Sequence, residues 1–352
     1  MTHELVPDRS AAPEALSRWT VEVERALREA ALPADGVLGR MAAYHMGWIE
    51  PDGSPASGGG KYIRPNLCLW AVEACGGRPL DALPAAGALE LVHNFTLVHD
   101  DVQDGDEQRR GRPTVWSLWG SAQAINAGDG LCALAFRTLL GGLPGMNGAE
   151  RSTRASRAVA ARVVLDALLE VIEGQCLDLE HECRPDTPLA TYLRMVEAKT
   201  GALLGASLEA GAVMAGAGED VQAHLRRAGR LLGVAFQLRD DWLGVWGDEA
   251  VTGKSHENDL VRRKLTHPLV AAYEGAGPDR RRALLALYAS RGPDEEPRIR
   301  RLMEELGGPD LTAHDAAARA SEAVVEVERC GFDEVRMQEF AHVAHYIAER
   351  SR

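Results

Sequence analysis

Residues 85–104 read AAGALELVHNFTLVHDDVQD, an almost wholly apolar run that ends in a cluster of aspartates. Apolar side chains occupy nearly every position up to residue 99, with His93 and His99 as the main polar members, and this predicts a buried helix. Asp100 and Asp104 are four residues apart, so they share one helix face. Like charges at that spacing repel one another and need compensation. Oxygen ligands placed in this way suit Mg²⁺, which binds one or two carboxylates together with substrate phosphates.

A second aspartate cluster lies about 140 residues further along the chain. Residues 229–246 read GRLLGVAFQLRDDWLGVW, which predicts another apolar helix that carries Asp240 and Asp241. Gln237 lies one turn earlier and shares their face. Either cluster alone could be a solvated helix end. Two buried helices that both carry carboxylates suggest a shared metal–diphosphate site inside a helical bundle.

Basic residues accompany these acidic clusters. Arg109 and Arg110 follow the first cluster, where they could pair with the carboxylates or bind a diphosphate. Residues 58–65 read GGGKYIRP. Glycine-rich backbone can approach an anion closely, and Lys61 and Arg64 place two positive charges about one helical turn apart. The alternative for this segment is an ordinary exposed loop.

The rest of the chain is typical of an all-α protein. Clusters of Gly and Pro separate long segments rich in Ala, Leu, Glu and Arg, in which apolar residues recur at helical spacing, as in residues 158–171. Alternating β-branched runs are nearly absent. We expect a flexible N-terminus over residues 1–15 and a single large domain over residues 16–352. Residues 201–218 are mostly small and include Glu209, which favours a tightly packed buried helix over a membrane span.

The composition of the chain excludes several classes of protein. Its 352 residues carry a formal net charge of −13, which disfavours a nucleic-acid partner because phosphate backbones bind clusters of Lys and Arg. Hydrophobic residues make up 45% of the chain, enough for a sizeable core, so a fully disordered chain is excluded. The N-terminus shows no secretory signal, and the six cysteines form no CxxC pair. These features favour a reduced, cytoplasmic protein.

Taken together, the motifs resemble those of the trans-isoprenyl diphosphate synthases, the polyprenyl synthetase family. They occur in order from about residue 35 to the end, as GGGKYIRP, LVHDDVQDGDEQRRGRP, GQCLDL, EAKTG, FQLRDD, TGK and NDLVRRKLTHPL. The resemblance implies an all-α isoprenoid synthase bundle that encloses a deep central cavity, usually in a homodimer. It also implies Mg²⁺-dependent condensation of isopentenyl diphosphate with an allylic diphosphate and release of pyrophosphate, with three Mg²⁺ ions when substrate is bound.

The resemblance further implies roles for individual residues. The implied Mg²⁺ ligands are Asp100, Asp104 and Asp240, and Asp101 and Asp241 complete the catalytic set with Lys199. The implied contacts to the allylic diphosphate are Arg109, Lys199, Lys254 and Lys264. The implied pocket for isopentenyl diphosphate consists of Lys61, Arg64, His93 and Arg110. The reacting centre is implied to be lined by Thr200 and Gln237, with Gln175 and Asp178 in support.

Two departures from the family pattern leave other functions open. The second motif usually reads DDxxD, but Gly244 stands here in place of the third acid. After Lys254 the family often has Pro and Gly, where this chain has Ser255 and His256. The alternatives are a class I terpene cyclase on the same bundle and a non-catalytic partner subunit of another synthase. We expect a synthase, because a cyclase does not need the isopentenyl diphosphate pocket and the intact first motif argues against a subunit.

The expected product length depends on the helix that carries Asp100. One helical turn rises about 5.4 Å, which is close to the length of one isoprene unit. Phe95 lies five residues before Asp100, where a bulky residue resembles C20-forming enzymes, and Thr96 leaves space beside it. We therefore expect C20 geranylgeranyl diphosphate, with a C15 product as the next choice. The alternative is that Phe95 simply packs in the core.

Overall fold

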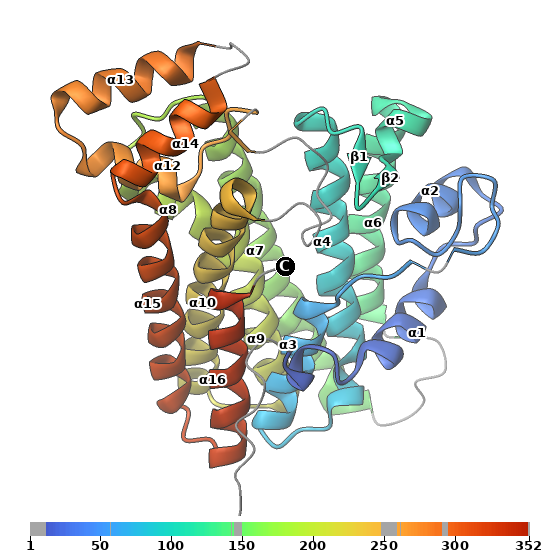
Figure 1. The fold of residues 1–352 in the computed structure, drawn as a ribbon. Coiled ribbons are helices and arrows are strands. Elements are labelled where there is room, and N and C mark those ends of the chain that lie inside the picture. The colour runs from blue at the N-terminus through green and yellow to red at the C-terminus, as the bar shows by residue number, and fades with distance from the viewer. Residues whose placement is uncertain are drawn as a thin grey trace, which may run out of the picture. The chain divides into compact units, whose positions relative to one another are not determined.

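The computed structural model of the chain describes residues 12–56, 58–141, 143, 150–247, 259–260, 262–290 and 295–350. Helices make up most of these residues (Figure 1), so the predicted all-α class is confirmed. Among the described residues, the one sheet is an antiparallel hairpin of two short strands, β1 (Gln108–Arg109) and β2 (Arg112–Pro113). Most of the predicted flexible N-terminus, residues 1–11, lies outside the described part of the chain.

The chain divides into two compact units, and each is described by itself. The first-motif unit comprises residues 15–169 and 203–226 and carries the first aspartate cluster. The second-motif unit comprises residues 1–14, 170–202 and 227–352 and carries the second cluster.

The first-motif unit is built almost entirely from helices. A 3₁₀ turn, η1 (Glu14–Leu16), precedes its helices. These are α1 (Thr20–Ala30), α2 (Val37–His45), α3 (Ile63–Ala74), η2 (Pro79–Ala82), α4 (Leu83–Gln103), α5 (Val115–Trp119) and α6 (Ser121–Gly141). The unit also contains the first part of α7 (Glu150–His181), most of α9 (Ala202–Ala215) and the start of α10 (Glu219–Trp246).

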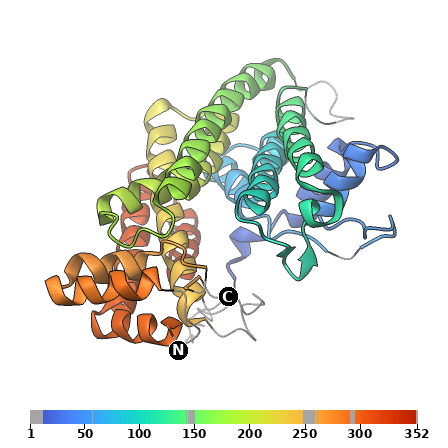
Figure 2. The same cartoon turned by 90° about the horizontal axis from the view of Figure 1, so that it is seen from above.

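Helix α4 is the predicted buried helix that carries the first aspartate cluster. It begins at Leu83 with Pro84 in its first turn, where a missing N–H costs nothing, and residues 85–92 are all buried. Helices α4 and α6 form the most extensive pairing among the described elements and lie side by side in both views (Figure 1 and Figure 2). Gly128 of α6 permits this close approach, because a Cβ at that position would overlap the ring of His99. The aspartates therefore lie at the end of a firmly packed helix.

The second-motif unit continues α7 and α10 and adds the C-terminal helices. These are α8 (Leu189–Val196), the π-helical turn η3 (Glu197–Gly201), α12 (His267–Gly275), α13 (Pro278–Ala289), α14 (Glu295–Glu305), α15 (Gly308–Glu328) and α16 (Glu334–Glu349). Helix α15 packs on both α12 and α16. The core of the unit gathers side chains from several of these helices, among them Tyr192, Leu238, Leu269, Ile299 and Met303.

Helix α9 confirms the prediction of a tightly packed helix within residues 201–218. Residues 203–213 are all buried. Its one charged residue, Glu209, accepts a hydrogen bond from Arg226 Nη1 at 3.1 Å. A Cβ at Gly211 would overlap the carbonyl oxygen of Cys68 in α3, so the small residues allow two helices to meet closely. Within the described ranges, we find no helix with the length and apolar character needed to cross a membrane.

We expect Gly211→Ala to lower the free energy of unfolding by about 1–3 kcal/mol, because the added methyl group must push α9 away from α3. Gly275→Ala in α12 is the matched control, since a Cβ there would meet open space. The control should be neutral or stabilising by up to about 1 kcal/mol, as alanine is the better helix former. Urea denaturation of both variants measures the difference, and equal stabilities would contradict the close packing.

Candidate active site

The carboxylates of the first aspartate cluster point in two directions. Asp101 is 1% exposed, and its Oδ1 accepts a hydrogen bond from Arg109 Nε at 2.6 Å. Asp100 is half-buried and Asp104 is exposed, and the N–H of Asp104 donates to the carbonyl of Asp100 at 2.8 Å. The last turn of α4 thus places Asp100 and Asp104 on one accessible face, while Asp101 turns inward to Arg109.

The surroundings of the cluster differ between Asp101, the inner carboxylate, and Asp100 and Asp104, the two outer ones. Burial raises the pKa of Asp101 to about 6, and Arg109 opposes this shift. In the described part of the chain, no group of three or more His, Cys, Asp or Glu is arranged to hold a metal ion. The two outer carboxylates are nevertheless hard oxygen donors one turn apart. They suit an Mg²⁺ ion whose other ligands come from a diphosphate and water.

The β1–β2 hairpin carries two adjacent arginines, Arg109 and Arg110. Its turn consists of Arg110 and Gly111, with φ of 54° and 73°, as in the two-residue turns that join tight hairpins. Arg109 pairs with Asp101, and the charges of Arg110 and Arg109 both act on His93. A left-handed conformation is unfavourable for arginine, so the surrounding structure must hold it in place.

Two arginines of the predicted isopentenyl diphosphate pocket act on the half-buried imidazole of His93, a third predicted member. The pKa of His93 is lowered well below its usual range, first by burial and then by the charges of Arg64 and Arg110. The ring is therefore neutral near pH 7. Lys61, the fourth predicted member, is exposed and lies just before α3. The charges of Arg64 and Arg110 in one region suit an anionic ligand.

Sequence reasoning missed three polar residues beside this cluster. Glu90 is buried, and its Oε1 accepts a hydrogen bond from Asn94 Nδ2 at 3.0 Å. Burial raises the pKa of Glu90, against the effect of Arg64 and Arg110. The charges of the hairpin arginines also act on His45. Burial, Arg109 and Arg110 together lower its pKa to about 3. Glu90 and Asn94 could have been recognised from the sequence, because they are two polar residues four positions apart within an apolar helix.

In the second-motif unit, Asp240 is held by the C-terminal end of the described chain. Its Oδ1 accepts a hydrogen bond from Arg350 Nη2 at 2.6 Å. The Arg350 guanidinium also stacks 3.9 Å from the ring centroid of Phe236, one turn before Asp240. The side chain of Asp240 is half-buried, so it keeps an accessible face.

Asp241 is an internal anchor and differs in this from Asp240. It is buried, and it accepts hydrogen bonds from Gln237 Nε2 at 2.9 Å, the backbone N–H of His267 at 2.8 Å and the Tyr192 hydroxyl. Burial raises the pKa of Asp241 to about 7, and the donated hydrogen bonds oppose the shift. Thr200 Oγ1 in turn donates to Gln237 Oε1 at 3.0 Å. The structure thus brings the two residues predicted for the reacting centre, Thr200 and Gln237, into contact.

Lys199 and Thr200 are presented by the π-helical turn η3. Such turns inside helices occur frequently at functional sites. Lys199 Nζ donates to Asp178 Oδ2 at 2.6 Å, and Gly174 in α7 allows the approach, since a Cβ there would overlap the Lys199 backbone. Asp178 was predicted to support this region, and the structure shows that it does so by pairing with Lys199. Gln175 is buried on the same helix.

The remaining predicted contacts lie near the segment that the structure does not describe. Lys254, with Ser255 and His256, lies outside the described residues. Lys264 is half-buried, and its N–H donates to the carbonyl of Asp259 at 3.0 Å. A Cβ built on Gly244 would overlap the carboxylate of Asp259. The space that the third acid of a DDxxD motif would need is therefore filled by another acid of the same unit.

Comparisons with known proteins show which families and structures the chain resembles. A family model described as polyprenyl synthetase matches residues 54–306. The (2E,6E)-farnesyl diphosphate synthase of Mycobacterium tuberculosis (strain ATCC 25618 / H37Rv) is 40% identical over 330 residues, which cover 92% of this chain and 89% of that protein. The geranylgeranyl diphosphate synthase of the same strain is 41% identical over 320 residues, which cover 89% and 87%.

Solved structures share the fold over nearly the whole chain. The crystal structure of polyprenyl synthetase from Streptomyces coelicolor A3(2) matches with a TM-score of 0.82 at 37% identity and covers 95% of this chain and 97% of that one. The crystal structure of polyprenyl synthase from Caulobacter crescentus CB15, complexed with calcium and isoprenyl diphosphate, matches with a TM-score of 0.81 at 28% identity. It covers 98% of this chain and all of that one (100%).

The site also predicts a pH dependence of stability, through the buried His267 that begins α12 beside Asp241. Its ring lies 2.9 Å from Thr312 Oγ1 and 3.1 Å from Asp315 Oδ2. Burial nevertheless lowers its pKa from 6.5 to about 4. Between these values the unfolded chain binds a proton that the folded protein does not. His267 therefore contributes stability above pH 6.5 that is lost as the pH falls toward 4.

We expect His267→Gln to be less stable than the wild type at pH 7 and to approach it as the pH falls from 6.5 to 4, because the variant lacks this titration. Denaturant unfolding at several pH values measures the gap. His345→Gln is the control, since that histidine lies on α16 with a half-exposed side chain. A gap that stays constant with pH for His267→Gln would contradict the assignment.

Proposed function

The chain belongs to the polyprenyl synthetase family, and we propose that it makes C20 geranylgeranyl diphosphate from isopentenyl diphosphate and an allylic diphosphate. It is a prenyltransferase, a short-chain isoprenyl diphosphate synthase. Relatives of nearly equal similarity are named farnesyl and geranylgeranyl diphosphate synthases. The choice of C20 therefore rests on the position of Phe95, and a C15 product is the next choice.

One observation carries the proposed activity: the hairpin places Arg109 at the aspartate cluster and its neighbour Arg110 with the cationic group around His93. Arg109 pairs with the aspartate cluster through Asp101, and Arg110 acts on the neutral His93 together with Arg64. An enzyme that condenses two diphosphates needs two neighbouring anion sites. We propose that the aspartate side binds the allylic diphosphate, and that Lys61, Arg64, His93 and Arg110 bind isopentenyl diphosphate.

A divalent metal fits the residues of the aspartate side. The family uses divalent ions, and the homologue from Caulobacter crescentus was crystallised with calcium. We propose that Asp100, Asp104 and Asp240 hold Mg²⁺, with three ions when substrate is bound. When bound, Mg²⁺ supplies positive charge that neutralises the diphosphate as its carbon–oxygen bond breaks. This part of the proposal rests on the donor types and on family membership.

The chain's own cations complete the binding of the leaving group. We propose that Arg109, Lys199, Lys254 and Lys264 contact the allylic diphosphate. Lys199 is held by Asp178, so its ammonium group is positioned before substrate arrives. Fixed charges of this kind stabilise the developing anion without reorganisation.

Thr200 and Gln237 are suited to the other half of the ionised substrate. The Thr200 hydroxyl donates to Gln237 Oε1, and one N–H of the Gln237 amide donates to Asp241, so the Thr200 proton and one amide proton are already used. Their oxygen lone pairs remain to face an allylic cation. The electron pair of the isopentenyl double bond then forms the new carbon–carbon bond. We propose that the departing pyrophosphate accepts the proton whose loss restores a double bond.

We also propose that residues 16–352 act as one synthase domain, that the protein is a homodimer and that it works in the cytoplasm. Leu165 and Leu169 lie four residues apart on α7 and are exposed, Leu169 by 67%, which suits an apolar contact with a second copy. All six cysteines are free thiols, which suits a reducing compartment.

A terpene cyclase remains the alternative because Gly244 replaces the third acid of the second motif. The proximity of Asp259 to Gly244 offers a packing reason for that departure, so it does not by itself favour a cyclase. A non-catalytic partner subunit is the less favoured alternative, since Asp100 and Asp104 stand on an accessible helix turn.

Incubation of the protein with Mg²⁺, isopentenyl diphosphate and a C5, C10 or C15 allylic diphosphate tests the activity. We expect longer prenyl diphosphates, and we expect Asp100→Asn to lower kcat by on the order of 10²–10³, because charge stabilisation of the leaving group is lost. Asp129→Asn on α6 is the control, since that acid is largely exposed. Hydrocarbons or terpene alcohols would instead indicate a cyclase, and no turnover by the wild type would indicate a subunit.

Phe95→Ala tests the product length. Phe95 is buried about one turn before Asp100, and its ring lies edge-to-face with His99 at 4.7 Å between centroids. We expect the variant to release products longer than C20, measured by chromatography of the dephosphorylated alcohols. Leu97→Ala is the control because it points about 200° away around the helix. Unchanged chain length in Phe95→Ala would show that this ring only packs in the core.

A further inference from the structure

We propose that Arg112 is a positioning residue that holds the turn at Arg110 in the geometry needed to bind isopentenyl diphosphate. The inference rests on the proposed function and concerns a residue outside the predicted site. Arg112 sits opposite Arg109 in the β1–β2 register, so its own anchorage fixes the strand that carries Arg109 and leads into the turn at Arg110.

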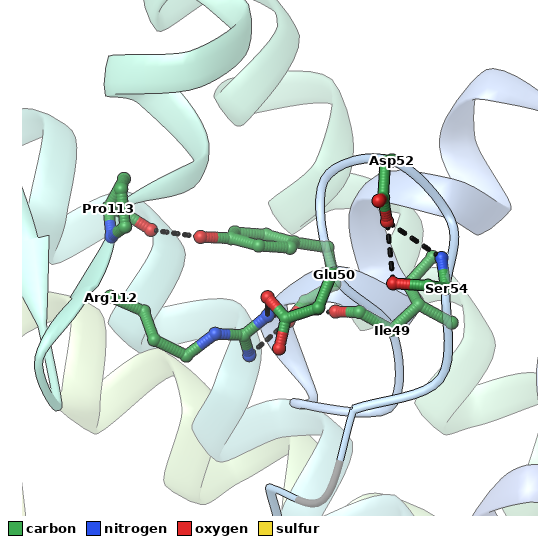
Figure 3. Close-up of polar contacts among 7 residues, drawn as sticks. Ile49, Glu50, Asp52, Ser54, Arg112 and Pro113 are labelled. Carbon is green, nitrogen blue, oxygen red and sulfur yellow. Dashed lines mark hydrogen bonds and ion pairs between the residues drawn. The ribbon is translucent and has the colours of Figure 1, made fainter.

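The guanidinium of Arg112 is bound on several sides by the end of α2 and the loop after it (Figure 3). Its Nη1 donates to the carbonyl of Tyr44 at 3.2 Å, and its Nη2 donates to the carbonyl of Ile49 at 2.8 Å and to Glu50 Oε2 at 3.2 Å. The group also stacks 4.4 Å from the ring centroid of Tyr44. The Tyr44 hydroxyl closes the arrangement by donating to the carbonyl of Pro113 at 2.7 Å.

The hairpin needs such an anchor because it is very short. Its strands pair only at Gln108↔Pro113 and Arg109↔Arg112, and two-stranded hairpins are marginal by themselves in water. Its turn also holds Arg110 at a φ of 54°, which is unfavourable for a residue with a Cβ. The contacts of Arg112 offset these costs, since charged hydrogen bonds to buried carbonyls are stronger than neutral ones.

The loop that receives Arg112 is itself braced. Ile49 bridges to Pro55, and the N–H of Glu50 donates to the carbonyl of Ser54 at 2.8 Å. Asp52 Oδ1 accepts hydrogen bonds from both the N–H and the hydroxyl of Ser54, at 2.9 and 2.7 Å (Figure 3). Arg112 therefore binds a loop whose conformation is fixed by its own hydrogen bonds.

The same loop continues toward the other half of the proposed pocket. The N–H of Ala56 donates to the carbonyl of Trp48 at 3.0 Å, and a Cβ at Gly58 would lie 3.1 Å from the carbonyl oxygen of Gly47. Lys61 and Arg64 follow within a few residues. Arg112 thus ties the hairpin of Arg110 to the loop that precedes Lys61 and Arg64.

Arg112 acts through its neighbours and not on the substrate. Its side chain is 28% exposed, and the contacts given above direct it toward α2 and the loop. Glu50 is 46% exposed, so the ion pair between them contributes little by itself. The carbonyl bonds and the tyrosine ring require the planar fork of arginine, which lysine cannot reproduce.

The test compares Arg112→Met with Arg18→Met in the wild-type background. Arg18 is a matched control, because it pairs with Glu73 at 2.6 Å, stacks on Trp19 and is 22% exposed in the same unit. We expect Arg112→Met to raise the KM for isopentenyl diphosphate by on the order of tenfold, with kcat changed by less than about threefold. Arg18→Met should leave that KM unchanged at a similar thermal midpoint. Titration calorimetry with isopentenyl diphosphate gives the same comparison without turnover.

A double-mutant cycle shows whether Arg112 works through Arg110. In an Arg110→Ala background, Arg112→Met should change the KM by less than about twofold, because the group that it positions is already gone. A full effect in that background would mean that Arg112 contacts the substrate itself and would overturn the inference, as would an unchanged KM in the single variant. Failure of the proposed function is distinguished by wild-type protein that consumes no isopentenyl diphosphate.

Discussion

The ion pair between Arg109 and the buried carboxylate of Asp101 is the interaction on which the first half of the site depends. Three aspartates of like charge follow an apolar helix, and such a cluster is unfavourable unless one member is neutralised. The pairing of Asp101 ties the hairpin to α4 and leaves Asp100 and Asp104 on the accessible side. The adjacent Arg110 is then carried toward His93 and Arg64. One contact thereby fixes the positions of both arginines of the hairpin relative to α4.

The second-motif unit also carries adjacent aspartates of like charge, and different partners stabilise them. Asp241 is buried, and among the described residues it accepts hydrogen bonds from three donors, namely Gln237, Tyr192 and the N-terminus of α12 at His267. Its neighbour Asp240 pairs with Arg350, which comes from the far end of the chain. Two consecutive aspartates with the same charge therefore take separate roles, an anchor and an accessible oxygen donor. The difference arises from their surroundings.

Much of this could be predicted from the sequence, because helical periodicity and residue spacing are local properties. The run of residues 85–99 predicted α4, and the spacing of Asp100 and Asp104 predicted a shared face. The roles of Tyr192, His267 and Arg350 could not be predicted, because their partners lie tens of residues away. The hairpin was also missed, since strands of two residues have no periodicity to detect. Glu90 and Asn94 were accessible to sequence reasoning but were overlooked within an apolar helix.

The sequence by itself determined the all-α class, the acidic helix ends and the family to which the chain belongs. These follow from periodicity, like-charge spacing and ordered motifs, which need no knowledge of distant contacts. The tertiary structure alone decided which carboxylate is buried, which arginine faces which group, and that Arg112 anchors the hairpin. These depend on desolvation and on hydrogen-bond partners brought together by folding, and neither quantity is encoded in any short segment.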